Sequence, residues 1–453
     1  MKGKDMKAIG LDVGTTTICI TVIDLESGKP VETKAMQNNS AVPGKHTWEY
    51  LQNPEIIKCI CISLLDEMCD EYTDIVSIGI SGQMHGIVYT GYGIAKSNLI
   101  TWQDERGNLF STEGITHARK LSETTGTTAA SGFGLVTMLH DAENGMIPPS
   151  VKAICTIGDY IAMVICGNDS PLLHPSNAAS LGGYCLNSGG FSADMPPGID
   201  KALLPEVTGG ESVIGKYRNI PVSCAVGDNQ CSVFGSLGTG VSALINIGTG
   251  GQISAVTGVP VIYGNDLECR PYIAGKYLSV GASLCGGYAL TMLKGFFAET
   301  LQLTGGEAPE DLYQKMNNWA EQAAGNGLSL GVDTRFKGTR NDPSLRGSIS
   351  GIGMENFTPG ALCLGVLEGI CTELHELSKG FIPPLPQSKK LAVSGGGVRS
   401  SKLMQHLLKD TFKTEIAIPV NTEEAAYGAA LISAVSAGII GIDRAGSLIG
   451  YEI

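Results

Sequence analysis

The stretch Ile9-Gly-Leu-Asp12-Val-Gly14-Thr15-Thr16-Thr17 decides the fold, together with the segment Ile18-Cys-Ile-Thr-Val-Ile23 that follows it. Alternation and β-branched residues on both sides predict two strands joined by a tight turn. Gly14 lets the backbone turn sharply and approach a ligand, and the threonines offer hydroxyl and backbone N–H groups to phosphate oxygens. Asp12 places a carboxylate beside this anion site, where it is suited to hold the water shell of a metal ion.

A second stretch echoes the first about half a chain later. It reads Leu244-Ile-Asn246-Ile-Gly248-Thr249-Gly250-Gly251 and again predicts strand, glycine-threonine turn and strand. Two such turns predict a duplicated domain that grips one polyphosphate from both sides.

Length and composition indicate two domains with a large core. The chain has 453 residues, of which 43% are hydrophobic, and its formal net charge is −13. A domain commonly takes about 100–200 residues, so two domains are expected. The acidic balance argues against a nucleic-acid or anionic-membrane partner. Any anionic substrate must therefore be met locally, by backbone N–H groups, Lys, Arg or a metal.

Cysteine usage and the first residues predict a cytoplasmic protein. The 13 cysteines are scattered without a Cys-x-x-Cys spacing, which is typical of reduced, mostly buried thiols. The segment Met1 to Lys7 runs straight into the first strand, so no secretory segment is expected. The segment Ala425 to Ile442 carries no charge, yet its Ala, Gly and Ser residues favour a close-packed internal helix over a membrane span.

Polar groups directly follow two predicted strands. The strand Asp74–Ile80 ends in Ser81-Gly-Gln83-Met84-His85-Gly86, and the short strand at Leu99 runs into Trp102-Gln-Asp104-Glu-Arg106. Domains of the α/β class bind ligands at such strand ends. An indole can stack on a sugar face, while a carboxylate and a guanidinium can bond hydroxyls. The alternative is that His85 and Trp102 are satisfied core residues, but two adjacent strand ends with the same chemistry favour a binding site.

Another carboxylate stands at the end of the strand predicted over Ile220–Val226, in Gly227-Asp228-Asn229-Gln230. Asp228 opens a predicted helix over Asn229–Leu237 and is well placed as a general base. Its alternative role is an N-cap for that helix, and the two roles are compatible.

Three consecutive glycines, Gly395, Gly396 and Gly397, lie between the strand predicted over Lys389–Ser394 and a helix from Ser401. Their missing side chains leave the space that the base and ribose of a nucleotide need. A steric turn is the alternative, although a turn needs only one glycine. The dinucleotide fingerprint Gly-x-Gly-x-x-Gly with a following acidic residue is absent, which argues against a Rossmann dehydrogenase.

Two long helices and one basic loop complete the prediction. Apolar spacing predicts helices over Trp48–Glu71 and Asn356–Leu377, the second with Thr358 as its cap and Pro359 in its first turn. The segment Arg335–Gly347 is rich in turn residues and contains Arg335, Arg340 and Arg346. A phosphate-facing role and a plain solvated loop both fit this segment.

The motifs stand in a fixed order. Along the chain they read Asp12-x-Gly-Thr-Thr, Gln83-Met-His-Gly, Trp102-x-Asp-x-Arg106, Gly227-Asp-Asn, Gly248-Thr-Gly-Gly, Gly395-Gly-Gly-x-x-Ser400 and Glu424-x-x-x-Gly428. This ordered set resembles the FGGY carbohydrate kinases over essentially the whole chain. The resemblance implies an α/β fold of two actin/hexokinase-like domains of the ribonuclease H type, with a cleft between them.

The resemblance also implies a role for each motif. A domain at 1–238 would hold the sugar and the first phosphate turn, and a domain at 239–453 would bind ATP. Mg²⁺ would lie near Asp12, and Asp228 would be the base that deprotonates a sugar hydroxyl. The implied nucleotide contacts are Gly14, Thr15, Thr16, Gly248, Thr249, Gly250, Gly395, Gly396, Gly397 and Ser400. The implied sugar contacts are Gln83, Met84, His85, Trp102, Asp104, Arg106, Asp228 and Asn229.

Within the family, Ser81-Gly-Gln-Met-His-Gly86, Thr101-Trp-Gln-Asp104 and the loop from Gly132 to Thr137 look most like the sedoheptulokinase branch. The expected reaction is phosphorylation of sedoheptulose by ATP to sedoheptulose 7-phosphate, with the loop at the far end of the sugar. A xylulokinase or another pentulose or polyol kinase is the nearest competitor. The expected partners are a small sugar and ATP, without nucleic acid or membrane, and a homodimer is an option.

Two alternatives come from other classes of protein. One is an actin-like ATPase without a sugar substrate, which has no need for a small polar pocket lined by Gln83-Met-His85, Trp102 and Asp104. The other is a sugar-responsive binding protein that has lost catalysis, against which the retention of both Asp12 and Asp228 argues.

Overall fold

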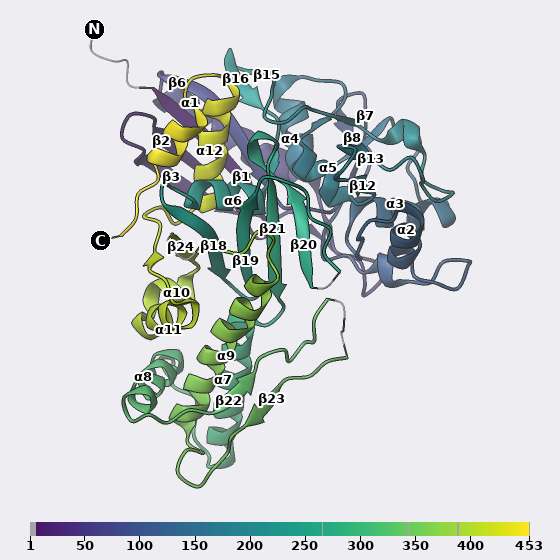
Figure 1. The fold of residues 1–453 in the computed structure, drawn as a ribbon. Helices are drawn as coiled ribbons and strands as arrows, with labels where there is room; N and C mark the ends of the chain where they lie inside the picture. Colours follow the sequence, from purple (N-terminus) through teal and green to yellow (C-terminus); the bar gives the residue numbers. More distant parts are fainter. Residues whose placement is uncertain (1–5, 265, 341, 343, 387–388, 453) are drawn as a thin grey trace. The chain divides into compact units, whose positions relative to one another are not determined.

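A computed structural model of the chain describes residues 6–264, 266–340, 342, 344–386 and 389–452 (Figure 1). The chain forms two compact units. Unit 1 comprises Met1–Thr239, Arg270–Lys276 and Asn421–Gly450, and unit 2 comprises Gly240–Cys269, Tyr277–Val420 and Tyr451–Ile453. The start of the segment Met1 to Lys7, and positions 341 and 343 of the predicted basic loop, lie outside the described residues.

The sheet of unit 1 is built on the quoted hairpin. Its strands run in the order β15-β16-β6-β1-β2-β3, with β17 also paired to β6. Strands β1, β2 and β3 form an antiparallel meander, while β6 is parallel to β1 and β16 is parallel to β6. Their bounds are β1 (Lys7–Val13), β2 (Thr17–Asp24), β3 (Pro30–Gln37), β6 (Ile75–Gly82), β15 (Val213–Tyr217), β16 (Ile220–Ser223) and β17 (Val226–Gly227).

Five strands of the sheet of unit 2 repeat the pairing of β3-β2-β1-β6-β16 in unit 1, while the edge strands differ, because β15 flanks β16 in unit 1 and β20 flanks β21 in unit 2. The order in unit 2 is β20-β21-β19-β18-β24-β25, again with an antiparallel meander followed by two parallel strands. The predicted echo of the first hairpin is therefore confirmed as the start of a second sheet with the same pairing. The bounds are β18 (Val241–Ile247), β19 (Gly251–Thr257), β20 (Leu267–Pro271), β21 (Tyr277–Ser283), β24 (Lys390–Ser394) and β25 (Ile416–Ala417).

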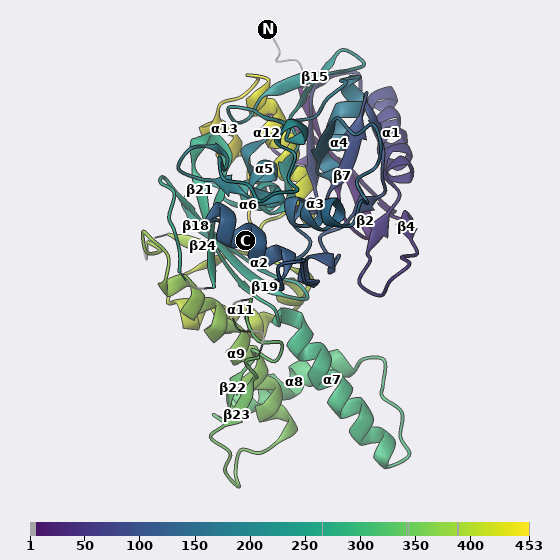
Figure 2. The ribbon, with the colours of Figure 1, turned by 90° about the vertical axis from the view of Figure 1, so that its right-hand side faces the viewer.

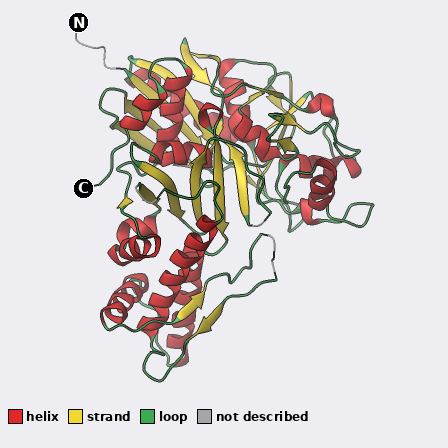
Figure 3. Cartoon of the chain, in the orientation of Figure 1, coloured by secondary structure: helices red, strands yellow, loops and turns green. Residues whose placement is uncertain are grey.

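Each unit combines its sheet with helices packed against it, as Figure 3 shows with helices in red and strands in yellow. Helices of unit 1 are α1 (Pro54–Glu71), α2 (His117–Thr125), α3 (Gly134–Glu143), α4 (Ile157–Cys166), α5 (Pro175–Leu181), α6 (Asp228–Ser236), α12 (Glu424–Ser436) and α13 (Ile442–Ser447). Helices of unit 2 are α7 (Gly286–Leu303), α8 (Leu312–Gly325), α9 (Pro359–Lys379), α10 (Gly396–Ser400) and α11 (Lys402–Phe412). Further short strands are β4 (Ala41–Val42), β5 (Leu51–Gln52), β7 (Val88–Gly91), β8 (Ile94–Ala95), β9 (Leu99–Ile100), β10 (Ala153–Cys155), β11 (Leu172–Leu173), β12 (Tyr184–Cys185), β13 (Gly190–Phe191), β14 (Glu206–Val207), β22 (Gly331–Asp333) and β23 (Ser348–Ser350).

Helix α12 comes late in the sequence but packs on β1, β6 and α6 of unit 1. Glycines allow the close approach, because a Cβ at Gly10 would lie 1.8 Å from the carbonyl oxygen of Ala426 and one at Gly79 would lie 1.9 Å from that of Ala429. The internal helix predicted from Ala425 is thus confirmed, although it ends at Ser436. Among the described residues, no helix is long and apolar enough to cross a membrane.

The helix predicted over Trp48–Glu71 begins six residues later than expected, at Pro54. Asn53 caps it, since its side chain accepts hydrogen bonds from Glu55 N at 2.9 Å and Ile56 N at 3.3 Å. A residue at this cap position is not itself helical, so the prediction is wrong for residues 48–53. Two of those residues form β5 instead, which pairs with β9.

The helix predicted over Asn356–Leu377 is confirmed as α9, with Thr358 as its cap. Helix α8 lies beside it, and both belong to unit 2 (Figure 2). The prediction that the glycine run is a loop is wrong beyond its first residue. Gly395 makes the turn with a φ of 105°. Gly396 does not have a positive φ, and it is the first residue of the short helix α10.

Candidate active site

The strand register of unit 1 brings Asp12 and Asp228 to the same edge of the sheet. Asp12 is paired with Ser81 across β1 and β6, and Ser81 is paired with Val226 of β17. Asp228 follows two residues after Val226, as the first residue of α6, and Gly227 rather than Asp228 is the cap of that helix. The carboxyl ends of these strands therefore present two carboxylates from distant parts of the sequence.

Both carboxylates resist ionisation. Burial, followed by the charge of Asp228, raises the pKa of Asp12 to about 7. Within the described part of the chain, its buried Oδ1 atom has no hydrogen-bond partner. Burial also raises the pKa of Asp228 to about 6, although the N–H of Asn229 and the charge of Arg270 favour its ionised form. An edge with this electrostatic environment is suited to bind a cation and to take up a proton.

The turn at Gly14 closes the first hairpin, with Gly14 N donating to the carbonyl oxygen of Thr17 at 3.1 Å. The hydroxyl of Thr15 is occupied within the protein. It donates to Gln83 Oε1 at 3.2 Å and accepts from Trp102 Nε1 at 3.1 Å. The turn predicted to meet phosphates is thus hydrogen-bonded directly to two of the residues predicted to meet the sugar.

An aromatic surface surrounds the end of β6. The Trp102 side chain is 47% exposed, so it is not a core residue. His85 has a φ of 64°, which is uncommon for a residue other than glycine. Its ring stacks on Phe133 with 4.1 Å between ring centroids, and its Nδ1 lies 2.8 Å from the carbonyl oxygen of Ser180. A Cβ at Gly132 would lie 2.0 Å from the carbonyl oxygen of Trp102, so the loop from Gly132 lies against this surface.

Met84 links this surface to the proposed base. A Cβ at Gly227 would lie 2.8 Å from the sulfur of Met84, so the methionine packs directly on the residue before Asp228. Asn229 follows Asp228 and donates its backbone N–H to the Oδ1 of that carboxylate at 2.7 Å. Met84 itself is only 6% exposed and Gln83 only 5%, whereas Asp228 and Asn229 are partly exposed.

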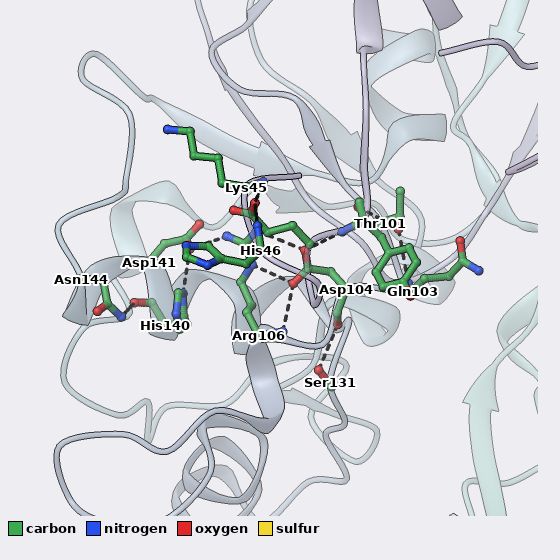
Figure 4. Close-up of polar contacts among 12 residues, drawn as sticks. Lys45, His46, Thr101, Gln103, Asp104, Arg106, Ser131, His140, Asp141 and Asn144 are labelled. Atoms are coloured by element: carbon green, nitrogen blue, oxygen red, sulfur yellow. Dashed lines mark hydrogen bonds and ion pairs between the residues drawn. The ribbon is translucent and has the colours of Figure 1, made fainter. Parts of the chain in front are cut away.

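Asp104 and Arg106 form a buried ion-pair cluster (Figure 4). Arg106 Nε donates to Asp104 Oδ1 at 2.8 Å, and its Nη1 donates to Asp141 Oδ1 at 2.7 Å. Ser131 Oγ donates to the carbonyl oxygen of Asp104 at 3.0 Å. The Arg106 side chain is only 2% exposed, so this cluster is internal, and Ser131 joins it to the loop from Gly132 that contacts Trp102.

The second turn lies in unit 2, and its backbone is held by the start of α7. Gly287 N donates to the carbonyl oxygen of Gly248 at 2.8 Å, and Tyr288 N donates to that of Thr249 at 2.9 Å. A Cβ at Gly286 would lie 2.3 Å from the carbonyl oxygen of Gly250, so the helix start and the turn are in close contact.

A cavity of about 680 Å³ in unit 2 joins this turn to the glycine run. Its walls are mostly apolar and come from α7, α8, α9, α10 and α11, with Gly248, Leu290, Tyr313, Asn317, Leu367, Gly396, Gly397, Ser400 and Met404 among the lining residues. A Cβ at Gly396 or Gly397 would meet no atom within 4 Å, whereas one at Gly395 would lie 2.2 Å from the carbonyl oxygen of Ile247. Gly395 is therefore a steric requirement, and the next two glycines keep the cavity wall free of side chains.

Sequence reasoning missed two charged residues near the carboxylates. Arg270 Nη1 lies 3.4 Å from Asn229 Oδ1 and favours the ionised form of Asp228. Glu423 lies close enough to raise the pKa of Asp12. No sequence pattern marks Arg270, while Glu423 directly precedes the Glu424-x-x-x-Gly428 motif. Two of the three arginines of the predicted basic loop form ion pairs, Arg335 with Asp333 and Arg340 with Glu268, while Arg346 donates to the carbonyl oxygen of Leu345.

Two sheets that share the pairing of five strands, each with a glycine-threonine turn after its first strand, define a duplicated α/β protein of the actin/hexokinase-like class. The family comparison agrees. The FGGY family of carbohydrate kinases matches over residues 7–245 with its N-terminal domain and over residues 233–437 with its C-terminal domain. The chain belongs to the FGGY family of carbohydrate kinases, and it is therefore a sugar kinase that uses ATP.

Relatives and solved structures cover nearly the whole chain. The chain is 27% identical to a sedoheptulokinase from Mus musculus, over 94% of this chain and 96% of that protein. It is 26% identical to a xylulose kinase from Staphylococcus xylosus, over 94% of this chain and 90% of that protein. The structure of a xylulose kinase from Rhodospirillum rubrum superposes with a TM-score of 0.83 at 19% identity, over 99% of this chain and 93% of that one. A gluconate kinase from Lactobacillus acidophilus gives 0.82 at 19% identity with the same coverage, so the structural likeness shows the fold alone.

Proposed function

We propose that this carbohydrate kinase transfers the γ-phosphoryl group of ATP to sedoheptulose, forming sedoheptulose 7-phosphate. The observation that carries the proposal is that one unit contains the exposed Trp102, His85 stacked on Phe133, and Asp228, which follows the Gly227 that Met84 contacts. The likeness to sedoheptulokinases over 94% of the chain supports this choice of sugar, and D-xylulose is the competing substrate because a xylulose kinase is 26% identical over the same share of the chain.

Asp228 is proposed as the general base. Its carboxylate takes the proton of the sugar hydroxyl while the sugar oxygen attacks the γ-phosphorus, and the bond to the β-phosphate oxygen breaks to release ADP. A raised pKa of about 6 makes this carboxylate a better proton acceptor than an exposed aspartate, while it stays largely ionised at pH 7 to 8. Phosphoryl transfer otherwise requires positioning and charge neutralisation rather than covalent chemistry.

Asp12 is proposed to hold Mg²⁺. Its buried Oδ1 atom lacks a hydrogen-bond partner in the described structure, which fits a carboxylate reserved for a cation. The described residues contain no group of three or more His, Cys, Asp or Glu side chains that could hold a metal. This agrees with Mg²⁺ chemistry, because that ion commonly takes one or two carboxylates and completes its shell with water and substrate phosphates. When bound, the ion would neutralise charge on the transferring phosphoryl group.

The remaining residues divide by exposure. We propose that His85, Trp102, Asp228 and Asn229 contact the sugar, since these have exposed surface. Gln83, Met84, Asp104 and Arg106 are buried, so we assign them the support of that surface. In each unit the N–H groups of the glycine-threonine turn are proposed to meet phosphate oxygens, and in unit 2 the cavity beside Gly396 and Gly397 is proposed to hold the adenosine.

Gly396→Val tests the nucleotide assignment. A Cβ at position 396 would meet no protein atom within 4 Å, so the valine side chain would extend into the cavity. We expect KM for ATP to rise about 10-fold or more, corresponding to a loss of at least ~1.4 kcal/mol, while KM for the sugar stays the same. Gly325→Val, at an exposed helical glycine of the same unit whose Cβ also meets no atom, is the matched control. An unchanged KM for ATP in folded Gly396→Val would remove the glycine run from the nucleotide site.

The sugar assignment is tested by comparing kcat/KM for sedoheptulose, D-xylulose, D-ribulose and glycerol. A site that pairs its buried polar groups with substrate hydroxyls discriminates against analogues that lack them. Sedoheptulose is therefore expected to give the highest value, because it fills the region against the loop from Gly132. A clear preference for D-xylulose would instead assign the protein to the xylulokinases and leave the kinase activity in place.

The cytoplasm is our proposed compartment for this enzyme. All 13 cysteines lie in the described part of the chain and are free thiols there, which agrees with a reducing compartment. A homodimer stays a prediction that sedimentation velocity of the purified chain can test.

A further inference from the structure

Two residues outside the motifs, Asn38 and Gln52, hold the turn Gly14–Thr16 by hydrogen bonds to its carbonyl oxygens. Asn38 donates twice, from Nδ2 to the carbonyl oxygen of Gly14 and from its backbone N–H to that of Thr16, both at 2.8 Å. Gln52 Nε2 donates to the carbonyl oxygen of Thr15, also at 2.8 Å. Asn38 is 8% exposed and Gln52 is 5% exposed, so these three hydrogen bonds are shielded from water.

Fixing the carbonyl oxygens also fixes the N–H groups. In a trans peptide unit the C=O and the following N–H point in opposite directions. The N–H groups of Thr15 and Thr16 are therefore turned away from Asn38 and Gln52. In the described structure neither N–H group has an acceptor. Successive backbone N–H groups on one side of a turn form an anion-binding concavity.

Gln52 connects the turn to the sugar side of the site. Its Oε1 accepts from Gln83 Nε2 at 2.9 Å, while Gln83 Oε1 accepts from Thr15 Oγ1 at 3.2 Å. The Thr15 hydroxyl in turn accepts from Trp102 Nε1 at 3.1 Å. The amide of Gln52 therefore links the backbone of Thr15 to Gln83 and, through the Thr15 hydroxyl, to Trp102.

Hydrogen bonds also hold the carbonyl oxygens of the turn in unit 2, but they come from different donors. The carbonyl oxygens of Gly248 and Thr249 accept from the backbone of Gly287 and Tyr288 at the start of α7. Among the described residues no helix start donates to the carbonyl oxygens of Gly14–Thr16, and two side-chain amides and one backbone N–H supply the donors there. The two turns are thus similar, but different donors bind their carbonyl oxygens. Because both arrangements leave the N–H groups of the turn exposed, we infer that orienting these N–H groups is their shared role.

We propose that Gln52 and Asn38 are positioning residues that aim the N–H groups of the Gly14–Thr16 turn at the phosphates and couple that turn to Gln83 and Trp102. This inference rests on the proposed kinase function. Neither side chain touches the reacting groups, and both act through the backbone that they hold.

The test uses Gln52→Glu and Asn38→Asp in the full chain. Each variant keeps the size and the acceptor of the native side chain but loses the donor to the turn. We expect kcat/KM for ATP to fall by about 10- to 100-fold, because small misplacements near reacting groups have effects of this size. We also expect faster hydrogen exchange at the amides of Gly14 and Asn38, which are hydrogen-bonded within the turn. Gln302→Glu, an exposed glutamine of α7, is the control for the same change of charge.

The two measurements separate failure of the inference from failure of the proposed function. Unchanged exchange in the folded variants would overturn the positioning role, whatever the enzyme phosphorylates. Faster exchange with unchanged kcat/KM would overturn the link between the turn and catalysis. If the wild-type chain phosphorylates no sugar, the proposed function fails, and exchange alone then decides whether the two side chains hold the turn. If Gln52→Glu does not fold, Gln52→Asn replaces it. The asparagine side chain is one methylene shorter, so its amide falls short of the carbonyl oxygen of Thr15.

Discussion

Replacing Asp228 by asparagine is expected to lower kcat for sugar phosphorylation by about 10²- to 10⁴-fold, the range typical of a lost general base. Asparagine keeps the shape of the side chain and an oxygen for the N–H of Asn229, so KM for ATP and for the sugar should change little. Asp194→Asn, at an exposed loop aspartate, is the control. Near-normal turnover of Asp228→Asn would remove Asp228 from the role of base.

The pH dependence gives this prediction a second measurement. Burial raises the pKa of Asp228 to about 6 in the folded chain. The base works when ionised, so wild-type kcat should fall about tenfold per pH unit below that value. Because the folded pKa lies above the unfolded one, ionisation of this group disfavours the folded state above pH 6, and protonation relieves that effect as the pH falls. Asp228→Asn should therefore melt at pH 8 no lower than the wild type, which separates lost catalysis from lost folding.

Asp12→Ala is expected to raise the Mg²⁺ concentration needed for half-maximal turnover and to lower kcat by about 10²-fold at saturating sugar. The reason is that a metal clamp on a transferring phosphoryl group contributes several kcal/mol, part of which its anchoring carboxylate provides. Asp12→Asn is the companion variant, since it keeps the volume of the side chain but removes the charge. Turnover titrated with MgCl₂ at fixed ATP makes the measurement.

An Mg²⁺ dependence equal to that of the wild type in both variants would make Asp12 a structural residue. Burial and the charge of Asp228 raise the pKa of Asp12 to about 7. A bound cation favours the ionised carboxylate, so Mg²⁺ should raise the thermal stability of the wild type more than that of Asp12→Asn. Calorimetry with and without MgCl₂ checks this difference independently of activity.

Local pattern was sufficient for the elements that organise the fold. The strand-turn-strand at Asp12 and its echo at Gly248 were predictable because alternation and a glycine-threonine turn are properties of adjacent residues. The cap at Thr358 and the strand end before Asp228 were predictable for the same reason. The start of α1 was missed because the apolar spacing continues through the Asn53 cap.

Long-range contacts account for what the sequence did not show. Arg106 reads as a candidate for hydroxyl contact, yet its partner Asp141 lies 35 residues away in sequence, on α3, and buries it. Gln52 carries no motif, and its hydrogen bond to Thr15 spans 37 residues. The placement of Arg270 beside Asn229 depends on a segment that returns to unit 1 after the second hairpin has begun.

Phosphorylation of sedoheptulose is tested by a product balance with purified chain, ATP, MgCl₂ and sedoheptulose. ADP and sedoheptulose 7-phosphate are measured in the same sample, by a coupled assay and by mass spectrometry. The proposed function predicts one sugar phosphate for each ADP, with ADP release nearly absent when the ketose is left out, because Asp228 serves a sugar hydroxyl rather than water. ADP release at the same rate with and without every ketose tested, and no sugar phosphate formed, would contradict it.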